Sequence, residues 1–124
     1  MTPEQKIKHI ILAKIADWSE TPIAEEVTAD NIDDLYDECE DKWDAIYEVR
    51  EGTFETKLPS PSSRHYESKS VAAKAPDGSY VGWTYWYGGG KHAEPEAIDW
   101  MNEAYDLTVT EEQKMVTVRT FAKA

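Results

Sequence analysis

The chain has 124 residues, of which 40% are apolar, and this length and composition predict one globular domain spanning residues 1–124. Twenty-five acidic residues against 13 basic ones give a formal net charge of −12. A charge of that sign disfavours nucleic acid and anionic membranes as direct partners and favours a basic protein, while the oligomeric state stays open.

The first predicted element is a helix over residues 3–18. Thr2, Pro3 and Gln5 form a helix-start signal in which Thr2 caps, Pro3 takes the first helical position and Gln5 completes a capping box. Charged residues flank an apolar patch that is too short for a secretory signal, and no stretch approaches the roughly 18 apolar residues of a membrane span. We therefore expect a cytoplasmic protein.

A second helix is predicted from about residue 31 to Gly52, where glycine favours a helix end. Its apolar residues recur at the helical period, so we expect this stripe, Trp43 included, to be buried. The stripe consists of Ile32, Leu35, Tyr36, Cys39, Trp43, Ile46 and Tyr47. Cys39 is the single cysteine in the sequence, which excludes an internal disulfide and a cysteine zinc site.

The opposite face of this predicted helix is acidic. Residues 30–51 hold ten acids and two bases, which is −8 of the total charge. Over roughly 33 Å of helix, that density approaches the spacing of phosphates along a DNA strand. Such a face is either a solvated surface or a docking surface for a basic partner, and its candidate binding residues are Asp33, Asp37, Asp41, Asp44 and Glu48.

The second half of the chain has the pattern of strands. Residues 58–63 form a loop rich in Pro and Ser, and residues 67–75 and 80–87 form a hairpin around Pro76-Asp77-Gly78. A short helix is expected over 95–104, followed by a hairpin of residues 107–109 and 115–121. The predicted fold class is α+β: two N-terminal helices, about 3–51, pack on a mostly antiparallel sheet of about four strands, 65–121, with a short inserted helix.

A candidate binding cluster follows from the geometry of the first hairpin. The strand over 80–87 is strongly aromatic and runs into Gly88-Gly89-Gly90. Pairing it with 67–75 brings residues 64–66 and the glycines to the same open end, where we expect a positive φ among the glycines. The candidate residues are Arg64, His65, Tyr66, Trp83, Trp86, Gly89, Lys91, His92 and Glu94. We expect Lys91 and His92 beside Arg64 or His65.

No motif in this cluster specifies a reaction. Gly88-Gly89-Gly90-Lys91 lacks the G-x-x-x-x-G-K-[ST] spacing of a phosphate loop. His92 and Glu94 fit an acid–base pair or a metal site as well as they fit ordinary loop hydrogen bonds. The sequence therefore predicts no catalytic residue, no metal and no cofactor, and does not decide whether the protein is an enzyme.

Two strings carry a resemblance to a known group of proteins. The strings S-R-H-Y-E-S-K-S-V-A (63–72) and G-W-T-Y-W-Y-G-G-G-K-H-A-E-P-E-A-I-D-W-M (82–101) resemble segments of small proteins encoded by tailed bacteriophages and prophages. The resemblance covers residues 63–121 and implies no catalytic residues, because that group has no assigned activity. It implies a small accessory protein, made in an infected bacterium, that binds a host factor.

Three functions remain open at this stage. The first is a binding protein that engages a basic host protein, such as a nucleic-acid-handling or defence factor, through the acidic helix. The alternative is a small ligand-binding module or hydrolase-like enzyme centred on Arg64, His65, Lys91, His92 and Glu94, with a pocket walled by Trp83 or Trp86. A structural protein of a virion is the third.

Overall fold

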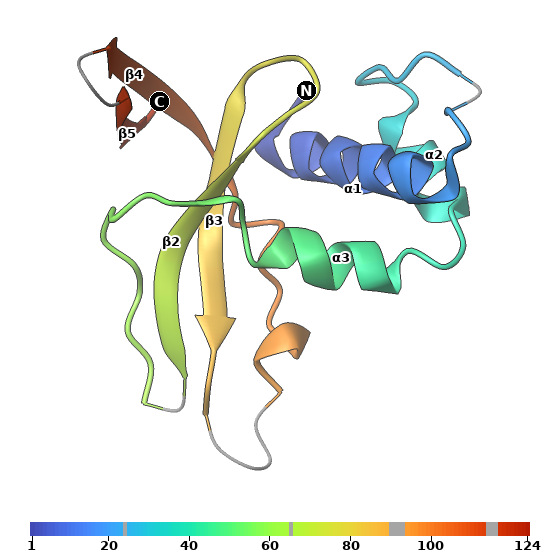
Figure 1. The fold of residues 1–124 in the computed structure, drawn as a ribbon. Coiled ribbons are helices and arrows are strands. Elements are labelled where there is room, and N and C mark those ends of the chain that lie inside the picture. The colour runs from blue at the N-terminus through green and yellow to red at the C-terminus, as the bar shows by residue number, and fades with distance from the viewer. Residues whose placement is uncertain (24, 65, 90–93, 114–116) are drawn as a thin grey trace.

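The computed structural model describes residues 1–124 except 24, 65, 90–93 and 114–116. For residues 111–113 and 117–119 it describes the backbone alone. The fold is α+β, as predicted: helices precede an antiparallel sheet (Figure 1). The elements are α1 (Pro3–Ser19), α2 (Ile32–Glu38), α3 (Trp43–Arg50), β1 (Phe54–Glu55), β2 (Glu67–Lys74), β3 (Tyr80–Tyr87), the 3-10 turn η1 (Pro95–Ala97), β4 (Tyr105–Gln113) and β5 (Thr117–Lys123).

Helix α1 forms where its sequence predicts it. The Thr2 hydroxyl accepts a hydrogen bond from the Gln5 backbone N–H at 3.2 Å, and the Gln5 side chain accepts one from the Thr2 N–H at 2.9 Å. This is the predicted capping box, and it satisfies donors that the first turn leaves free. Ile7, Ile11 and Leu12 form the buried stripe of the helix.

The predicted second helix is wrong in one respect, because it is two helices. The chain leaves helical geometry at Cys39, passes through Asp41 at φ 53°, and starts again at Trp43. Lys42 stabilises the break, since its ammonium donates to the Tyr36 carbonyl at 2.9 Å and lies 4.3 Å from the centre of the Tyr36 ring. The break allows α2 and α3 each to pack against α1 at a separate angle (Figure 1).

The sheet is an antiparallel meander in the order β1-β2-β3-β4-β5. The predicted β2–β3 hairpin is confirmed, with Glu67 opposite Tyr87 at its open end and Lys74 opposite Tyr80 at its turn. A fifth strand, the two-residue β1, pairs with β2 and was not predicted. The helix expected over 95–104 is wrong: η1 covers three residues, and the described chain from Ile98 to Ala104 is not helical.

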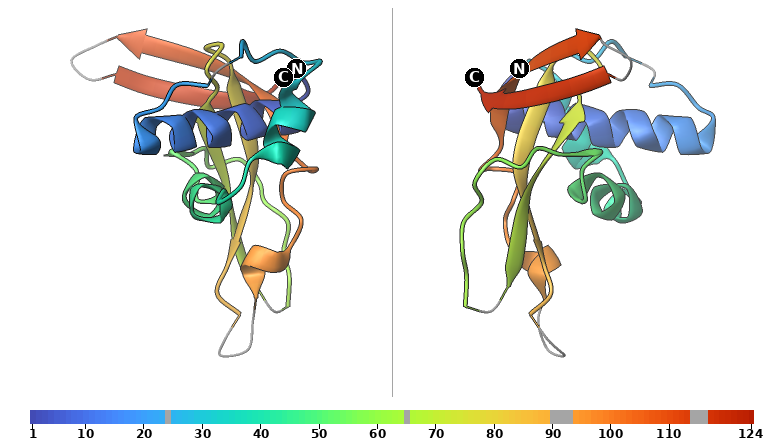
Figure 2. Two further views of the ribbon diagram at one scale, coloured as in Figure 1. Left: turned by 90° about the vertical axis from the view of Figure 1, so that its right-hand side faces the viewer. Right: turned by 60° about the vertical axis from the view of Figure 1, so that its left-hand side comes forward.

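Strands β4 and β5 form the second predicted hairpin, which is longer than expected. Only Tyr105, Asp106 and Leu107 of β4 pair with β3, so the rest of the hairpin projects from the sheet as a two-stranded ribbon (Figures 1 and 2). Lys6 of α1 holds its base, with an ion pair of 2.6 Å to Asp106. The Phe121 ring packs there on the rings of Phe54 and Tyr80.

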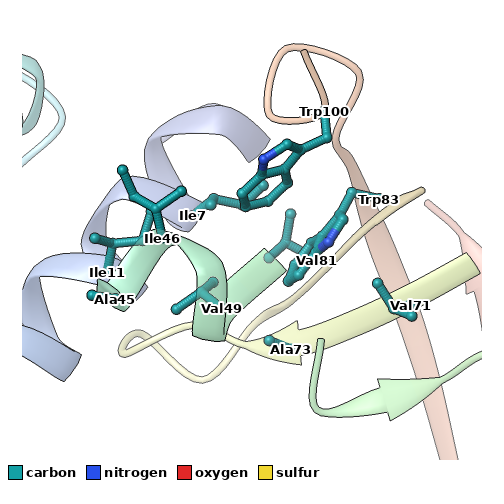
Figure 3. Close-up of a cluster of buried hydrophobic side chains, with 10 residues drawn as sticks. All are labelled: Ile7, Ile11, Ala45, Ile46, Val49, Val71, Ala73, Val81, Trp83 and Trp100. Carbon is teal, nitrogen blue, oxygen red and sulfur yellow. The ribbon is translucent and has the colours of Figure 1, made fainter. Parts of the chain in front are cut away.

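One hydrophobic cluster joins the helices to the sheet (Figure 3). Its members come from α1, α3, β2, β3 and the segment after η1: Ile7, Ile11, Ala45, Ile46, Val49, Val71, Ala73, Val81, Trp83 and Trp100. The helices cover the face of the β2–β3 hairpin that carries Val71, Ala73, Val81 and Trp83 (Figure 2). Trp100 is buried, with its ring centre 5.3 Å from that of Trp83.

Candidate functional site

The five predicted acidic residues all have exposed side chains. Asp33 and Asp37 lie on α2, Asp41 lies in the break, and Asp44 and Glu48 lie on α3. We call these five residues the acidic surface. All ten acids of residues 30–51 are exposed, so the segment presents its charge to solvent rather than to the core.

The charge does not follow one straight helix. The comparison with the phosphate spacing of DNA assumed a continuous helix of roughly 33 Å. Because the chain breaks between Glu38 and Trp43, the carboxylates are distributed over two helices and a left-handed residue instead. The acidic surface is therefore a patch, and the regular line of charge that the sequence suggested is wrong.

Asp33 differs from the other members of the acidic surface because it is engaged within the fold. Its carboxylate pairs with the Lys8 ammonium of α1 at 2.9 Å and accepts a hydrogen bond from the Gln5 amide at 3.3 Å. These hydrogen bonds, first from Lys8 and then from Gln5, lower the pKa of Asp33 below its ordinary value. Among the described residues, the other four carboxylates have no basic group within ion-pair distance, so they are available to a partner.

Trp43 and Tyr47 of α3 lie beside these carboxylates and are exposed, at 66% and 47% of their surface. The prediction that Trp43 is buried is wrong. The break at Cys39–Lys42 changes the helical phase. Ile46 of the expected stripe is buried, but Ala45 and Val49 face the core in place of Trp43 and Tyr47. We call Trp43 and Tyr47 the aromatic pair; they are four residues apart and share one face of the helix.

One of the two tryptophans assigned to the candidate binding cluster is placed differently from the prediction. Trp83 is fully buried, and its indole N–H donates to the Arg50 carbonyl at 2.8 Å, so it belongs to the core; it lines neither of the two hollows described below. Trp86 lies on the opposite face of β3 and is half-buried. Its indole nitrogen is buried and has no hydrogen-bond partner within the described part of the chain.

The open end of the β2–β3 hairpin matches the prediction where it is described. Gly88 and Gly89 have φ values of 72° and 91°, which confirms the expected positive φ. Arg64 is exposed and Tyr66 is half-buried at the same end, and Glu94 is exposed just before η1. His65, Lys91 and His92 lie outside the described residues, and so does their expected proximity to Arg64.

A hollow of about 390 Å³ lies at this open end. Its lining is mostly polar: Ser60, Ser62, Ser63, Tyr66, Glu67 and Tyr87 contribute to it. Ser68 of β2 also lines the hollow. Its hydroxyl forms hydrogen bonds with the Ser60 hydroxyl at 3.1 Å and with the Pro61 carbonyl. The Pro/Ser loop is thereby fixed along β2, as a crossing loop within the fold.

A second hollow, of about 230 Å³, lies between α1 and the C-terminal end of α3. Ile10, Val49 and Ala73 supply apolar surface, and Lys14, Glu48 and Glu51 supply charged groups. Glu48 belongs to the acidic surface, so this hollow adjoins it. The sequence did not predict the hollow, because nothing in the linear pattern places α1 beside Gly52 and Thr53.

Arg50 is a structural residue that the sequence analysis missed. It is 8% exposed, its guanidinium donates to the Trp86 carbonyl, and the guanidinium carbon lies 4.8 Å from the centre of the Tyr85 ring. These contacts fix the end of α3 to the edge of β3 beyond its pairing with β4. Its position in the last turn of a helix is a signal that could have identified it, since a positive charge there interacts favourably with the helix dipole.

Within the described residues there is no group of three or more His, Cys, Asp or Glu side chains that could hold a metal ion. No described helix is both long and apolar enough to span a bilayer. Comparisons of the chain with protein-family models, curated proteins and solved structures find no match in any of the three. The acidic surface with the aromatic pair and the open end of the β2–β3 hairpin are thus the two candidate sites.

Proposed function

We propose that the protein is a binding protein that engages a basic partner through the acidic surface and the aromatic pair. The observation that carries the proposal is the exposure of Trp43 and Tyr47 beside carboxylates that lack an ion-pair partner among the described residues. The resemblance to bacteriophage proteins suggests the setting: the cytoplasm of an infected bacterium, with a host nucleic-acid-handling or defence protein as the partner.

The two groups of residues have different roles in this proposal. Tryptophan and tyrosine are enriched among the few interface residues that supply most of the binding energy. Exposed carboxylates contribute more to the rate of association and to the choice of partner than to affinity itself. Trp43 and Tyr47 are therefore the anchors, and Asp37, Asp44 and Glu48 attract the basic partner.

The test is a capture experiment followed by a titration. A variant with Asp37→Asn, Asp41→Asn, Asp44→Asn and Glu48→Gln removes four charges and leaves the Asp33–Lys8 pair in place. We expect the wild-type protein to capture a basic host protein from bacterial lysate, and this variant to bind the purified partner more weakly and with less dependence on salt. We expect Trp43→Ala with Tyr47→Ala to weaken binding without changing its salt dependence.

The control variant removes the same number of charges elsewhere, through Asp17→Asn, Glu55→Gln, Glu96→Gln and Glu103→Gln, which all concern exposed residues. If the two neutralised variants lose affinity equally, net charge rather than the acidic surface is responsible. If both bind as tightly as the wild type, the proposed function is wrong.

A second candidate function is the binding of a small polar ligand at the open end of the hairpin. The hollow of about 390 Å³ favours it, because pockets for small molecules usually fall in the range of about 300–1,000 Å³. Screening a set of small polar compounds by NMR should then shift the signals of Tyr66 and Tyr87, and Tyr66→Ala should abolish the shifts. A screen without shifts at these residues counts against this candidate.

A further inference from the structure

We infer that the hollow between α1 and α3 receives one apolar side chain of the basic partner, flanked in the partner by lysine or arginine. The inference rests on the proposed function and adds the chemistry of the segment that is recognised. The occupant is a basic peptide segment with an apolar anchor, because both the lining of the hollow and the surrounding charge favour that composition.

The base of the hollow is apolar and firmly held. Val49 and Ala73 belong to the hydrophobic cluster and are 6% and 4% exposed, while Ile10 packs against the same cluster from α1. An apolar side chain that enters the hollow would thus lie against the outer surface of the core. A volume of about 230 Å³ is too small for a folded element and suits a single large side chain.

The wall formed by the end of α3 is fixed by close packing against β2. Gly52 has φ 74°, and a Cβ atom at this position would lie only 2.5 Å from the Cβ of Val71. The Thr53 N–H then donates to the Ala72 carbonyl at 2.8 Å. A cavity that is formed before binding costs less free energy to fill than one that must open.

The charge around the hollow favours a basic neighbour for the anchor. Glu48 and Glu51 lie at its edge, and both are exposed. Lys14 is the basic residue of the lining. Its ammonium lies 5.6 Å from the centre of the Trp18 ring, in a cation–π contact. The remaining acidic surface continues along α3 from Glu48 to Asp44, so lysine or arginine next to the anchor on the α3 side would meet carboxylates.

The test uses a displayed library of 12-residue peptides selected on the wild-type protein. Thr53→Trp fills the hollow from its edge, because Thr53 is exposed and any residue except proline keeps the hydrogen bond to Ala72. The matched control is Thr108→Trp, which adds the same bulk at an exposed position of β4. The neutralised variant of Asp37, Asp41, Asp44 and Glu48 is measured in parallel, and thermal unfolding verifies that each variant is folded.

We expect selected peptides to carry an apolar residue flanked by lysine or arginine. Thr53→Trp should weaken their binding at least about tenfold, which corresponds to about 1.4 kcal/mol. Alanine at the apolar position of the peptide should have the same effect, since buried anchor residues contribute at least this much to binding. Thr108→Trp should bind like the wild type.

Two outcomes would contradict different parts of this proposal. Peptides that bind Thr53→Trp as tightly as the wild type, yet lose affinity for the neutralised variant, overturn the role of the hollow and leave the proposed function standing. A selection that yields no basic peptides, or only peptides that bind the neutralised variant unchanged, overturns the proposed function and the inference together.

Discussion

At the scale of single residues, Gly52 is a position where both the backbone conformation and the neighbouring side chain favour glycine. It ends α3 with φ 74°, and a methyl group there would collide with Val71. We expect Gly52→Ala to lower the free energy of unfolding by about 2–6 kcal/mol, because a strained φ and an overpacked contact each cost about 1–3 kcal/mol. Urea denaturation measures the change.

Gly78 provides the control for this prediction. Its φ is 92°, and a Cβ atom would meet nothing within 4 Å. Gly78→Ala should therefore cost only the backbone strain, about 1–2 kcal/mol. Equal losses for the two variants would show that contact with Val71 contributes nothing and that positive φ alone makes glycine necessary.

Trp83 and Trp43 show how differently two tryptophans of one small protein contribute to stability. Trp83 is fully buried and its indole N–H donates to the Arg50 carbonyl, whereas Trp43 is mostly exposed. We expect Trp83→Phe to lower the free energy of unfolding by about 2–4 kcal/mol, through lost volume and an unsatisfied carbonyl.

Trp43→Phe is the matched control, and its effect should stay within about 0.5 kcal/mol, as is usual for surface substitutions. Both values come from urea unfolding followed by far-UV circular dichroism. A large loss for Trp43→Phe would mean that the exposed aromatic pair is needed for the fold, which would weaken its assignment as a binding anchor.

At the scale of elements, the turn of the β2–β3 hairpin contains a pH-sensitive contact. The Asp77 carboxylate accepts hydrogen bonds from the Ser79 hydroxyl at 2.6 Å and from the Ser79 N–H at 2.9 Å. These bonds, the hydroxyl first, lower the pKa of Asp77 below its ordinary value. A lowered carboxyl pKa gives stability that is present above the unfolded pKa, about 3.9, and is lost as the pH falls through the folded pKa.

Ser79→Ala removes the stronger of these two bonds. We expect the pKa of Asp77, measured by NMR titration of the carboxyl group, to move up toward its ordinary value. The stability lost between pH 5 and pH 2 should become smaller than in the wild type. The effect on pH dependence should vanish when Asp77→Asn is already present, and a persistent effect in that background would assign the titration to another group.

The helices and the hairpin differ in how far local sequence determines them. Residues 2–5 specify the start of α1 through a capping box, and Pro76-Asp77-Gly78 specifies the turn, so both were predictable from a few neighbours. The break between α2 and α3 was not, because the apolar stripe continues across it at the helical period. What ends α2 is the reach of Lys42 back to the Tyr36 carbonyl, together with packing on α1, and neither is visible as a pattern.

The candidate surfaces show the same limit. The acidic residues were predictable as exposed, since charge at that density cannot be buried. The exposure of Trp43 and Tyr47 follows from the phase of α3, which depends on where the break falls. The hollow between α1 and α3 requires these two helices, the segment that follows α3 and Ala73 of β2 to come together, and such a long-range arrangement leaves no local signal.

At the scale of the whole molecule, charge is distributed in conflict with stability. The net charge is −12, and residues 30–51 hold −8 of it, nearly all on exposed side chains without ion-pair partners in the described residues. Concentrated like charge keeps a protein soluble but weakens the compact state through self-repulsion. Neutralising these residues would remove the loss of stability that their repulsion causes. That the sequence keeps the charge is understandable if the charge binds a partner.

This conflict predicts that neutralising the acidic surface stabilises the fold. Neutralising Asp37, Asp41, Asp44 and Glu48 should raise the free energy of unfolding by about 0.5–1 kcal/mol at low salt, since each like-charge pair on a helix costs roughly 0.2–0.5 kcal/mol. Asp33 stays in place because its pair with Lys8 fastens α2 to α1. Salt screens exposed charges over a Debye length of about 30 Å at 0.01 M and about 3 Å at 1 M, so the gain should disappear at 1 M salt.

The control with Asp17, Glu55, Glu96 and Glu103 neutralised should gain less, because those residues are dispersed over the chain. Thermal unfolding at both salt concentrations measures the change. A variant that is less stable than the wild type at low salt would show that the acidic surface supports the fold and is not kept, at a cost in stability, for a partner.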